Sequence, residues 1–240
     1  MTTILRVLAA LVLAFVSFGV AAQSTELSVD GEPLPFEAKG SKDFSFPGRL
    51  GEGVSIFVTG LAHVPRIESN SVMRILAPDG SMAGALGCRG EGEGGGLCKV
   101  HLAKLPASGR YTVRIITPGA SAARGAIAVS SDLPCEIAAR GATLLRGTHP
   151  GQVARCKFTA RAGERLGMSI EVGEWPAGTR EITLGMSQPG GQFLLMHVVQ
   201  QVMLEKGIAP RALPASGTYI VDIDAGYGTL PPLSLSLTGR

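Results

Sequence analysis

Four cysteines are the residues of this 240-residue chain whose type and spacing most directly predict chemistry. Cys88, Cys98, Cys135 and Cys156 all follow an N-terminal leader, and an even cysteine count in an exported chain favours disulfides. Three pairings are possible. We expect the local one, Cys88–Cys98 and Cys135–Cys156, because each bridge then stays within one copy of a repeat described below. Zinc is the alternative, but the spacings fit no zinc pattern, so we predict no metal site.

Side chains for acid–base or nucleophilic catalysis are present, but they form no recognisable catalytic motif. His63, His101, His149 and His197 lie far apart in the sequence, and we interpret each as an ordinary surface or rim residue. The chain contains neither H-E-x-x-H nor G-x-S-x-G. We therefore predict no catalytic residue.

Acidic residues in the second half of the chain offer oxygen ligands or an acid–base pair. Asp222 and Asp224 are two positions apart and fall on one face of an expected strand, while Glu171 and Glu174 lie on another strand or loop. Such carboxylates can bind calcium or act as acid and base. A strand face in contact with solvent explains the same charges more simply, and we adopt that interpretation.

Two loop segments could contact a ligand. The glycine-rich string GEGEGGG at 90–96 lacks the G-K-[ST] of a phosphate-binding loop, and its two glutamates would repel an anion. We interpret it as a flexible hairpin loop that could carry contacts. Trp175, in GEWPAGT, could stack on a sugar or anchor a partner, but we expect it to cap the core against Pro176. No cofactor is predicted.

A repeated string indicates which elements position these residues. LPASGRY at 105–111 recurs as LPASGTY at 213–219. Proline ends a strand, Ser-Gly supplies a turn, and the alternation that follows predicts a half-buried strand. We expect the ring of each repeated tyrosine to be buried and its hydroxyl to bond to a backbone group. Ser108 and Ser216 are then turn residues and not nucleophiles.

The repeat extends upstream of these strings. The segment 42–60 matches 155–173 in its order of strand, glycine-bearing turn and Ser-Ile-x-Val strand. The segments 72–80 and 182–191 are both strands that enter a Pro/Gly turn. With 33 glycines, 15 prolines and little helical periodicity, the chain is predicted to be all-β.

We predict two consecutive antiparallel, jelly-roll-like β-sandwich domains, residues 23–132 and 133–240, because each repeat has the size and turn density of one two-sheet unit. The boundary is placed near Asp132-Leu133-Pro134, and so short a linker suggests that the two sandwiches are packed together. The segment FLLMHVVQQVML at 193–204 is apolar on every face. It could form strands or a buried helix, and we favour strands.

The N-terminus predicts export. Arg6, an apolar run at 7–20 and the small residues Ala21 and Ala22 have the layout of a signal peptide, which we assign to residues 1–22. The run is shorter than the roughly 20 apolar residues of a transmembrane helix, so we expect no membrane span in the mature chain. After cleavage, 21 basic residues stand against 19 acidic ones, without a basic run, which gives no support for nucleic acid as a partner. The expected location is periplasmic or secreted.

The ordered motifs resemble those of the bacterial pre-peptidase C-terminal domain. In the first copy the likeness rests on Asp43-Phe44-Ser45-Phe46, Ser55–Val58, Leu76–Gly80 and Leu105–Ile115. In the second copy it rests on Lys157-Phe158, Ser169–Val172, Pro189–Gly191, Leu213–Ile223 and Gly226-Tyr227. The resemblance implies a jelly-roll-like sandwich of the kind often appended to secreted peptidases. Some members bind calcium or matrix proteins such as collagen, but Arg155 replaces the acidic counterpart of Asp43 and the acidic cluster of a calcium site is absent.

These observations favour a binding function without catalysis. We expect an exported module that recognises a protein or a polysaccharide through loops near 61–71, 88–98 and 173–180. The alternative is a periplasmic structural or accessory subunit of an envelope complex, which an exposed apolar patch at a sheet edge would favour. A hydrolase is a third hypothesis, and a histidine clustered with two carboxylates in a concave pocket would favour it.

Overall fold

The computed structural model describes residues 24–65, 70–90, 96–177, 179–202 and 207–239, and every regular element in them is a β-strand. The predicted all-β fold class is therefore confirmed. The predicted signal peptide lies outside the described residues. No described segment forms a helix long and apolar enough to cross a membrane.

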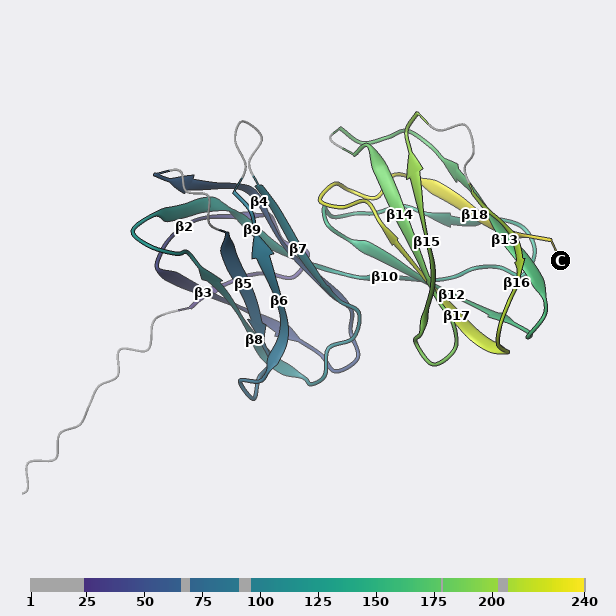
Figure 1. The fold of residues 1–240 in the computed structure, drawn as a ribbon, viewed down its shortest axis with the longest axis horizontal. Coiled ribbons are helices and arrows are strands. Elements are labelled where there is room, and N and C mark those ends of the chain that lie inside the picture. Colours follow the sequence, from purple (N-terminus) through teal and green to yellow (C-terminus); the bar gives the residue numbers. More distant parts are fainter. Residues whose placement is uncertain (1–23, 66–69, 91–95, 178, 203–206, 240) are drawn as a thin grey trace, which may run out of the picture.

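The strands β1 to β9 form two sheets, which together we call the N-terminal sandwich (Figure 1). Sheet A has the order β1-β3-β8-β5-β6 and sheet B the order β2-β9-β4-β7. The strands of sheet A are β1 (Thr25–Glu26), β3 (Ser41–Gly48), β8 (Gly109–Ile116), β5 (Ser71–Leu76) and β6 (Met82–Cys88). Those of sheet B are β2 (Leu34–Lys39), β9 (Ala122–Ser131), β4 (Val54–Val64) and β7 (Gly96–Leu102).

The strands β10 to β18 form the C-terminal sandwich in the same way. Sheet C has the order β10-β12-β17-β14-β15 and sheet D the order β11-β18-β13-β16. The strands of sheet C are β10 (Leu133–Glu136), β12 (Val153–Ala160), β17 (Gly217–Asp224), β14 (Glu181–Ser187) and β15 (Phe193–Gln200). Those of sheet D are β11 (Thr143–Leu145), β18 (Leu233–Thr238), β13 (Arg165–Val172) and β16 (Gly207–Ala212).

The two sandwiches share one strand order, and each contains one pair that differs from the predicted antiparallel arrangement. At the edges of sheets A and C, β1 runs parallel to β3 and β10 runs parallel to β12. In both cases the intervening strand, β2 or β11, belongs to the opposite sheet. The chain therefore crosses between sheets before it returns, and such a crossover allows neighbouring strands to run in the same direction.

The repeated tyrosines form the same corner in both sandwiches, as the sequence predicts. The Tyr111 hydroxyl donates to the Ala107 carbonyl at 2.8 Å and accepts from the Ala107 N–H at 3.2 Å. The Tyr219 hydroxyl makes the corresponding bonds with Ala215 at 2.7 and 3.2 Å. Each hydroxyl thus ties the turn before the strand to the strand itself.

Each sandwich encloses its own cluster of buried apolar side chains. One cluster draws on residues between 27 and 129, the other on residues between 137 and 235, and no residue belongs to both. The corner tyrosines lie in these clusters, where Tyr111 stacks on Phe46 and Tyr219 stacks on Phe158 at ring-centroid distances of 5.3 and 5.2 Å. Stacked aromatic pairs of this kind add about 1 kcal/mol beyond their burial.

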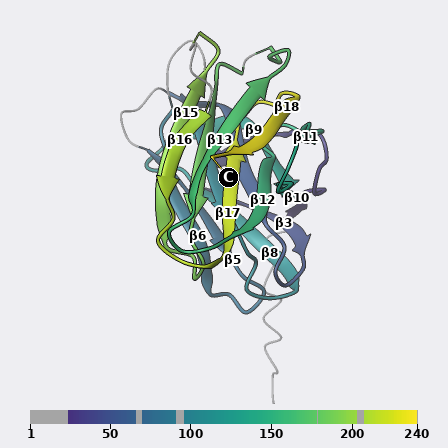
Figure 2. The same cartoon turned by 90° about the vertical axis from the view of Figure 1, so that its right-hand side faces the viewer.

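Sheet B contacts sheet C where the two sandwiches lie side by side, joined by β10 (Figure 1). Phe57 of β4 is 1% exposed but lies outside the N-terminal core cluster, because its ring packs against Gly151 of the other sandwich. The Ser130 hydroxyl donates to the Pro150 carbonyl at 2.7 Å across the same junction. Seen from the C-terminal end, sheet D lies in front and sheet C behind it (Figure 2).

The segment predicted to form strands at 193–204 begins with β15, while residues 203–206 lie outside the described residues. Phe193 pairs with Ser187 and Leu195 with Met186, so Leu194 is an extra residue in a β-bulge. A bulge shifts the alternation of side chains by one position. This shift, together with an apolar outer face, explains why the segment is apolar on every side.

Candidate functional site

Both predicted disulfides are present. Cys88–Cys98 ties the edge strand of sheet A to the edge strand of sheet B. Cys135 and Cys156 stand opposite each other on the parallel strands β10 and β12 and are bonded to each other. The described residues contain no free cysteine, and two disulfides are typical of an oxidising compartment.

The repeated serines are turn residues, as predicted. The Ser108 hydroxyl oxygen accepts a hydrogen bond from the Leu50 N–H at 2.9 Å. The Ser216 hydroxyl oxygen accepts one from the Ala162 N–H, also at 2.9 Å. Ser108 therefore links its turn to the turn between β3 and β4, and Ser216 links its turn to the turn between β12 and β13. Neither contact involves a base.

The histidines do not gather at one site, but the predicted surface location is wrong for His63. This side chain is buried on β4, where Nε2 lies 2.8 Å from the Ser71 hydroxyl and Gly90 leaves no room for a Cβ beside the ring. Burial lowers the pKa of His63. His149 and His197 are half-buried, and Nε2 of His197 has no hydrogen-bond partner within the described residues.

His101 is the histidine that approaches a catalytic geometry. Its Nε2 lies 3.0 Å from Oδ1 of Asp132, and its register partner on β4 is Ser55. Serine, histidine and aspartate are the residue types of a hydrolytic triad. However, Ser55 is fully buried at the junction and its hydroxyl has no hydrogen-bond partner among the described residues. A substrate cannot reach this hydroxyl, so the geometry does not favour the hydrolase hypothesis.

Asp222 and Asp224 do not lie on a solvent-exposed face, because the N-terminal sandwich covers this part of sheet C. Asp224 accepts from the Lys99 ammonium at 2.5 Å and from the Gly226 N–H at 2.7 Å. Oδ1 of Asp222 lies 3.8 Å from the Arg155 guanidinium and has no hydrogen-bond partner among the described residues. The described residues include no group of three or more His, Cys, Asp or Glu side chains that could hold a metal ion.

The charges at this junction are partly removed from water. Burial raises the pKa of Asp222, and the positive charge of Arg155 opposes that rise. Burial lowers the pKa of Lys99, and its ion pair with Asp224 opposes that fall. Charges in such surroundings interact more strongly than they would in bulk water.

The loops expected to carry contacts are described only in part. Residues 66–69, 91–95 and 178 lie outside the described residues. The residues on either side of 66–69 and 91–95 belong largely to strands β4, β5, β6 and β7, whose ends extend into the predicted loop ranges. The glycine-rich string at 90–96 therefore stays a hypothesis.

Trp175 is half-buried and packs against the C-terminal core cluster, as the sequence predicts. With Pro176 and Arg146 it also lines a groove of about 640 Å³ at the rim of the C-terminal sandwich. Glu174 is exposed and also lines this groove, Glu171 is exposed nearby, and neither joins Asp222 in a common site.

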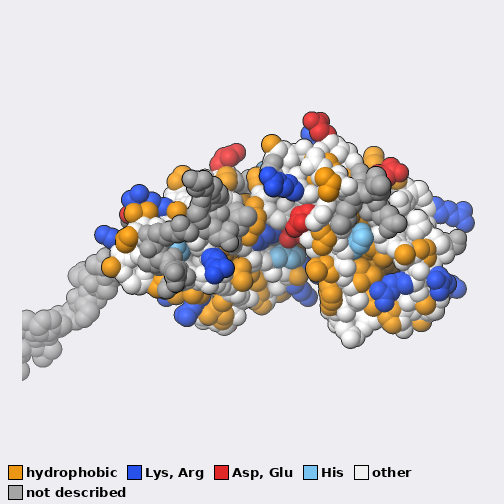
Figure 3. Space-filling model, turned by 45° about the horizontal axis from the view of Figure 1, so that its top comes forward, with side chains coloured by type: hydrophobic (Ala, Val, Ile, Leu, Met, Phe, Trp, Pro, Cys, Tyr) orange, Lys and Arg blue, Asp and Glu red, His pale blue; other side chains and the backbone are white. Residues whose placement is uncertain are grey.

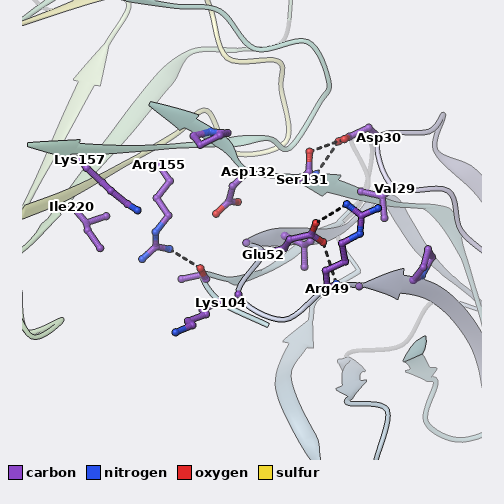
Figure 4. A pocket seen from close by; sticks show the side chains of 17 residues that line it. Val29, Asp30, Arg49, Glu52, Lys104, Ser131, Asp132, Arg155, Lys157 and Ile220 are labelled. Carbon is purple, nitrogen blue, oxygen red and sulfur yellow. Dashed lines mark hydrogen bonds and ion pairs between the residues drawn. The ribbon is translucent and has the colours of Figure 1, made fainter. Parts of the chain in front are cut away.

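A cleft of about 870 Å³ lies where the two sandwiches meet (Figure 4). Its walls come from the turn between β3 and β4, the residues after β7, the linker between β9 and β10, and the outer faces of β12 and β17. This volume falls in the range of ligand-binding pockets, which often form where two domains meet. The cleft is therefore the candidate functional site.

Charged side chains of both signs line the cleft, and the Arg49 guanidinium lies 3.8 Å from the Glu52 carboxylate. Lys104, Arg155 and Lys157, which we call the basic corner, lie on one side, with Glu52 on the other side and Asp132 between them (Figure 4). The Arg155 guanidinium is held across the junction by a 3.1 Å bond to the Ala103 carbonyl. Lys104 and Lys157 are exposed and have no ion pair or hydrogen bond among the described residues.

The carboxylates opposite the basic corner are held in place. Glu52 accepts from the Arg49 N–H at 3.1 Å, and Asp30 accepts from the Ser131 N–H and hydroxyl at 2.8 and 2.6 Å. Elsewhere, charges of both signs lie among hydrophobic side chains over both sandwiches, with no broad area of one sign on the face in Figure 3. In the cleft the carboxylates are therefore held by neighbouring groups, whereas Lys104 and Lys157 have no partner among the described residues.

Sequence reasoning did not find this site. Lys104 directly precedes the first repeat string, and Arg155 and Lys157 alternate with buried residues on β12, so each looks like an ordinary surface charge. The one available signal was the very short linker at Asp132, which implies that the residues around it lie close together in space.

No protein-family model matches the chain, and comparison with curated proteins gives no match. Among solved structures, the chain is similar to Aeromonas hydrophila PliG, a periplasmic inhibitor of g-type lysozyme, at 18% identity over 45% of this chain and 99% of that one, with a TM-score of 0.30. It is similar to the CUB1-EGF-CUB2 region of human MASP-1/3 at 7% identity over 85% of this chain and 100% of that one, with a TM-score of 0.24. Similarities this weak transfer no function to the chain.

Proposed function

We propose that this chain is an exported, non-catalytic binding module that recognises a protein partner in the cleft between its two sandwiches. The observation that carries the proposal is the cleft itself, which both sandwiches build and in which two lysines have no partner among the described residues. A binding partner would supply the missing anions. The two disulfides support export, because such bonds persist in oxidising compartments.

The lining of the cleft favours a protein over a polysaccharide. It presents the basic corner on one side and, on the other, carboxylates together with Arg49, and polypeptides carry charges of both signs whereas acidic polysaccharides carry one. Among the described lining residues there is no aromatic ring on which a sugar could stack. Complementary charges of both signs also fix the register of a protein partner.

The shared strand order and the paired tyrosine corners support a related proposal about origin. We infer that the halves 23–132 and 133–240 are two copies of one domain of the pre-peptidase C-terminal type. In such a pair the two sandwiches act as scaffolds, and the residues that bind a partner lie at the junction that the second copy creates.

A specific observation also favours the role of an accessory subunit. Phe193 and Met196, both on the edge strand β15, are 61% and 65% exposed. Adjacent exposed apolar side chains are typical of surfaces that contact another protein. Docking on an envelope protein would cover them.

A cleft-filling variant tests the proposed function. Ile220→Trp places a neutral, bulky ring on the cleft wall, and Thr112→Trp places the same ring at the corresponding position of sheet A as a matched control. The immobilised mature protein and both variants are exposed to envelope extract, and retained proteins are identified by mass spectrometry. We expect one partner that wild type and Thr112→Trp retain and that Ile220→Trp loses.

Retention of the same proteins by all three forms would overturn the assignment of the cleft. Saturable binding of a glycan that Ile220→Trp abolishes would replace the protein partner with a polysaccharide. Turnover of any substrate, abolished by a single substitution, would overturn the non-catalytic assignment.

A further inference from the structure

The cleft continues onto an open part of sheet C. Lys157, Ile220, Ser187 and Phe193 are successive register partners across β12, β17, β14 and β15. Lys157 and Ile220 line the cleft, whereas Phe193 lies at the far edge of the same sheet. The row therefore leads from the basic corner to the edge of the sandwich on one face.

Phe193 is placed on this face by the bulge and by a glycine. Its ring lies 3.6 Å from the position that a Cβ of Gly185 would occupy. Because Leu184 and Met186 point into the core, Gly185 faces outward, and so does the ring that covers it. Met196 is the register partner of Gly185 and faces the same way. We call Phe193, Gly185 and Met196 the apolar shelf.

The sandwich fold does not require the apolar shelf. In sheet A the corresponding row is Ser45, Thr112, Leu76 and Met82. The position of Gly185 is occupied there by Arg74, which is exposed. Met82 is itself 54% exposed, so sheet A also carries an apolar side chain at this edge. The lysine at one end of the row, the aromatic ring at the other and the glycine beneath that ring are specific to sheet C, although the two sheets share one strand order.

The row also has a defined length. Three spacings between neighbouring strands separate β12 from β15, which corresponds to about 14 Å, or about four residues of extended chain. An extended segment that crosses the strands can therefore contact the basic corner and the apolar shelf at once. The side chains at both ends of the row are available for contact: the Lys157 ammonium has no hydrogen-bond or ion-pair partner among the described residues, and the Phe193 side chain is 61% exposed.

We propose that the protein partner presents an extended segment with a carboxylate side chain in the basic corner and a large apolar side chain on the apolar shelf, about four residues apart. This inference rests on the proposed function and specifies its ligand. The carboxylate would accept hydrogen bonds from Lys157, Lys104 and Arg155, and the apolar side chain would lie against the Phe193 ring. Lysine and arginine side chains bind carboxylates through charge-assisted hydrogen bonds.

Peptide selection tests this inference directly. Phage bearing random peptides of about twelve residues, long enough to span the row, are selected on the immobilised mature chain. We expect enriched peptides to share an Asp or Glu and a large apolar residue about four positions away. The affinity of the best peptide is then measured by fluorescence anisotropy for wild type and variants.

The variants separate the two contacts. Lys157→Gln and Phe193→Ala should each weaken the peptide about tenfold, which is the scale of one charged hydrogen bond or one apolar anchor. Because the two sites lie far apart, their effects should multiply to about a hundredfold in the double variant. Lys39→Gln and Met82→Ala remove a lysine and an apolar side chain outside the row, and they should leave the affinity unchanged.

Three results would overturn the inference: no enrichment, enriched peptides without the acidic and apolar pair, or equal affinity of the Lys157→Gln and Phe193→Ala variants to wild type. Unfolding midpoints of the variants equal to that of wild type exclude misfolding as a cause of lost binding. If Ile220→Trp still abolishes capture of the natural partner, only the inference about the segment fails. If it does not, the proposed function fails as well.

Discussion

Removing one hydroxyl from a corner tyrosine should destabilise its sandwich without creating a cavity in the core. In Tyr219→Phe the ring stays buried and stacked on Phe158, but the N–H and carbonyl of Ala215 lose their shared partner. Because Ala215 is only partly buried, losing these bonds should cost about 0.5–1.5 kcal/mol. For a domain of this size, each kcal/mol lowers the melting temperature by about 4–8 °C.

The equivalent tyrosine in the other sandwich allows the same test to be repeated, and a third tyrosine serves as a control. Tyr111→Phe removes the equivalent bonds to Ala107 in the other sandwich and should have an effect of the same size. Tyr227→Phe removes the hydroxyl of a half-buried tyrosine that makes no hydrogen bond among the described residues, and it should change stability little. Urea denaturation followed by far-ultraviolet circular dichroism measures all three variants.

The double variant extends the test to the domain division. Because Tyr111 and Tyr219 belong to clusters with no common residue, their effects on the free energy of unfolding should add. Unfolding curves of Tyr111→Phe and Tyr219→Phe that coincide with wild type would refute the role of the corner. Strong non-additivity would refute the independence of the two cores.

Three further measurements address other parts of the molecule. The double variant Cys88→Ser/Cys98→Ser should lose about 2–3 kcal/mol of unfolding free energy, because the bridge closes a short loop in the unfolded chain, and an unchanged urea midpoint would contradict this. Phe57→Ala should lower the free energy of unfolding by about 3–5 kcal/mol and accelerate proteolysis at the linker, because the Phe57 ring fills the junction against Gly151. An unchanged rate of proteolysis would indicate that other contacts hold the junction. Burial raises the pKa of Asp222 in the folded state above its ordinary value of 3.8. Protonation of this carboxylate therefore favours the folded state; the stabilisation is fully present below pH 3.8 and is lost as the pH rises through the raised pKa. Asp222→Asn should therefore gain stability relative to wild type as the pH rises through this window, and a constant difference between their urea midpoints would contradict the assignment.

The sequence was informative where a structural requirement is local. The turn and tyrosine of LPASG-x-Y lie within a few residues of each other, and the corner hydrogen bonds span four positions. The disulfides join cysteines 10 and 21 positions apart, so their pairing followed from proximity along the chain. Alternation of apolar residues predicted strands because one face of each must be buried.

The sequence was uninformative about what covers the outer faces of the sheets. Asp222 alternates with buried residues as a solvent-exposed charge would, and only the packing of one sandwich on the other places it at a junction. The cleft was missed for the same reason, since its residues come from segments far apart in sequence. The bulge at Leu194 also shows that one inserted residue defeats the alternation rule, which is why the face occupied by Phe193 could not be assigned.

The connection between the sandwiches contains no free hinge. A single residue, Asp132, separates the end of β9 from the start of β10, and its side chain is held by His101. Three residues further on, Cys135 is covalently fixed to Cys156 on the strand that carries two of the three basic-corner residues. The width of the cleft is thus fixed before a partner arrives, so binding does not carry the entropic cost of ordering one sandwich relative to the other.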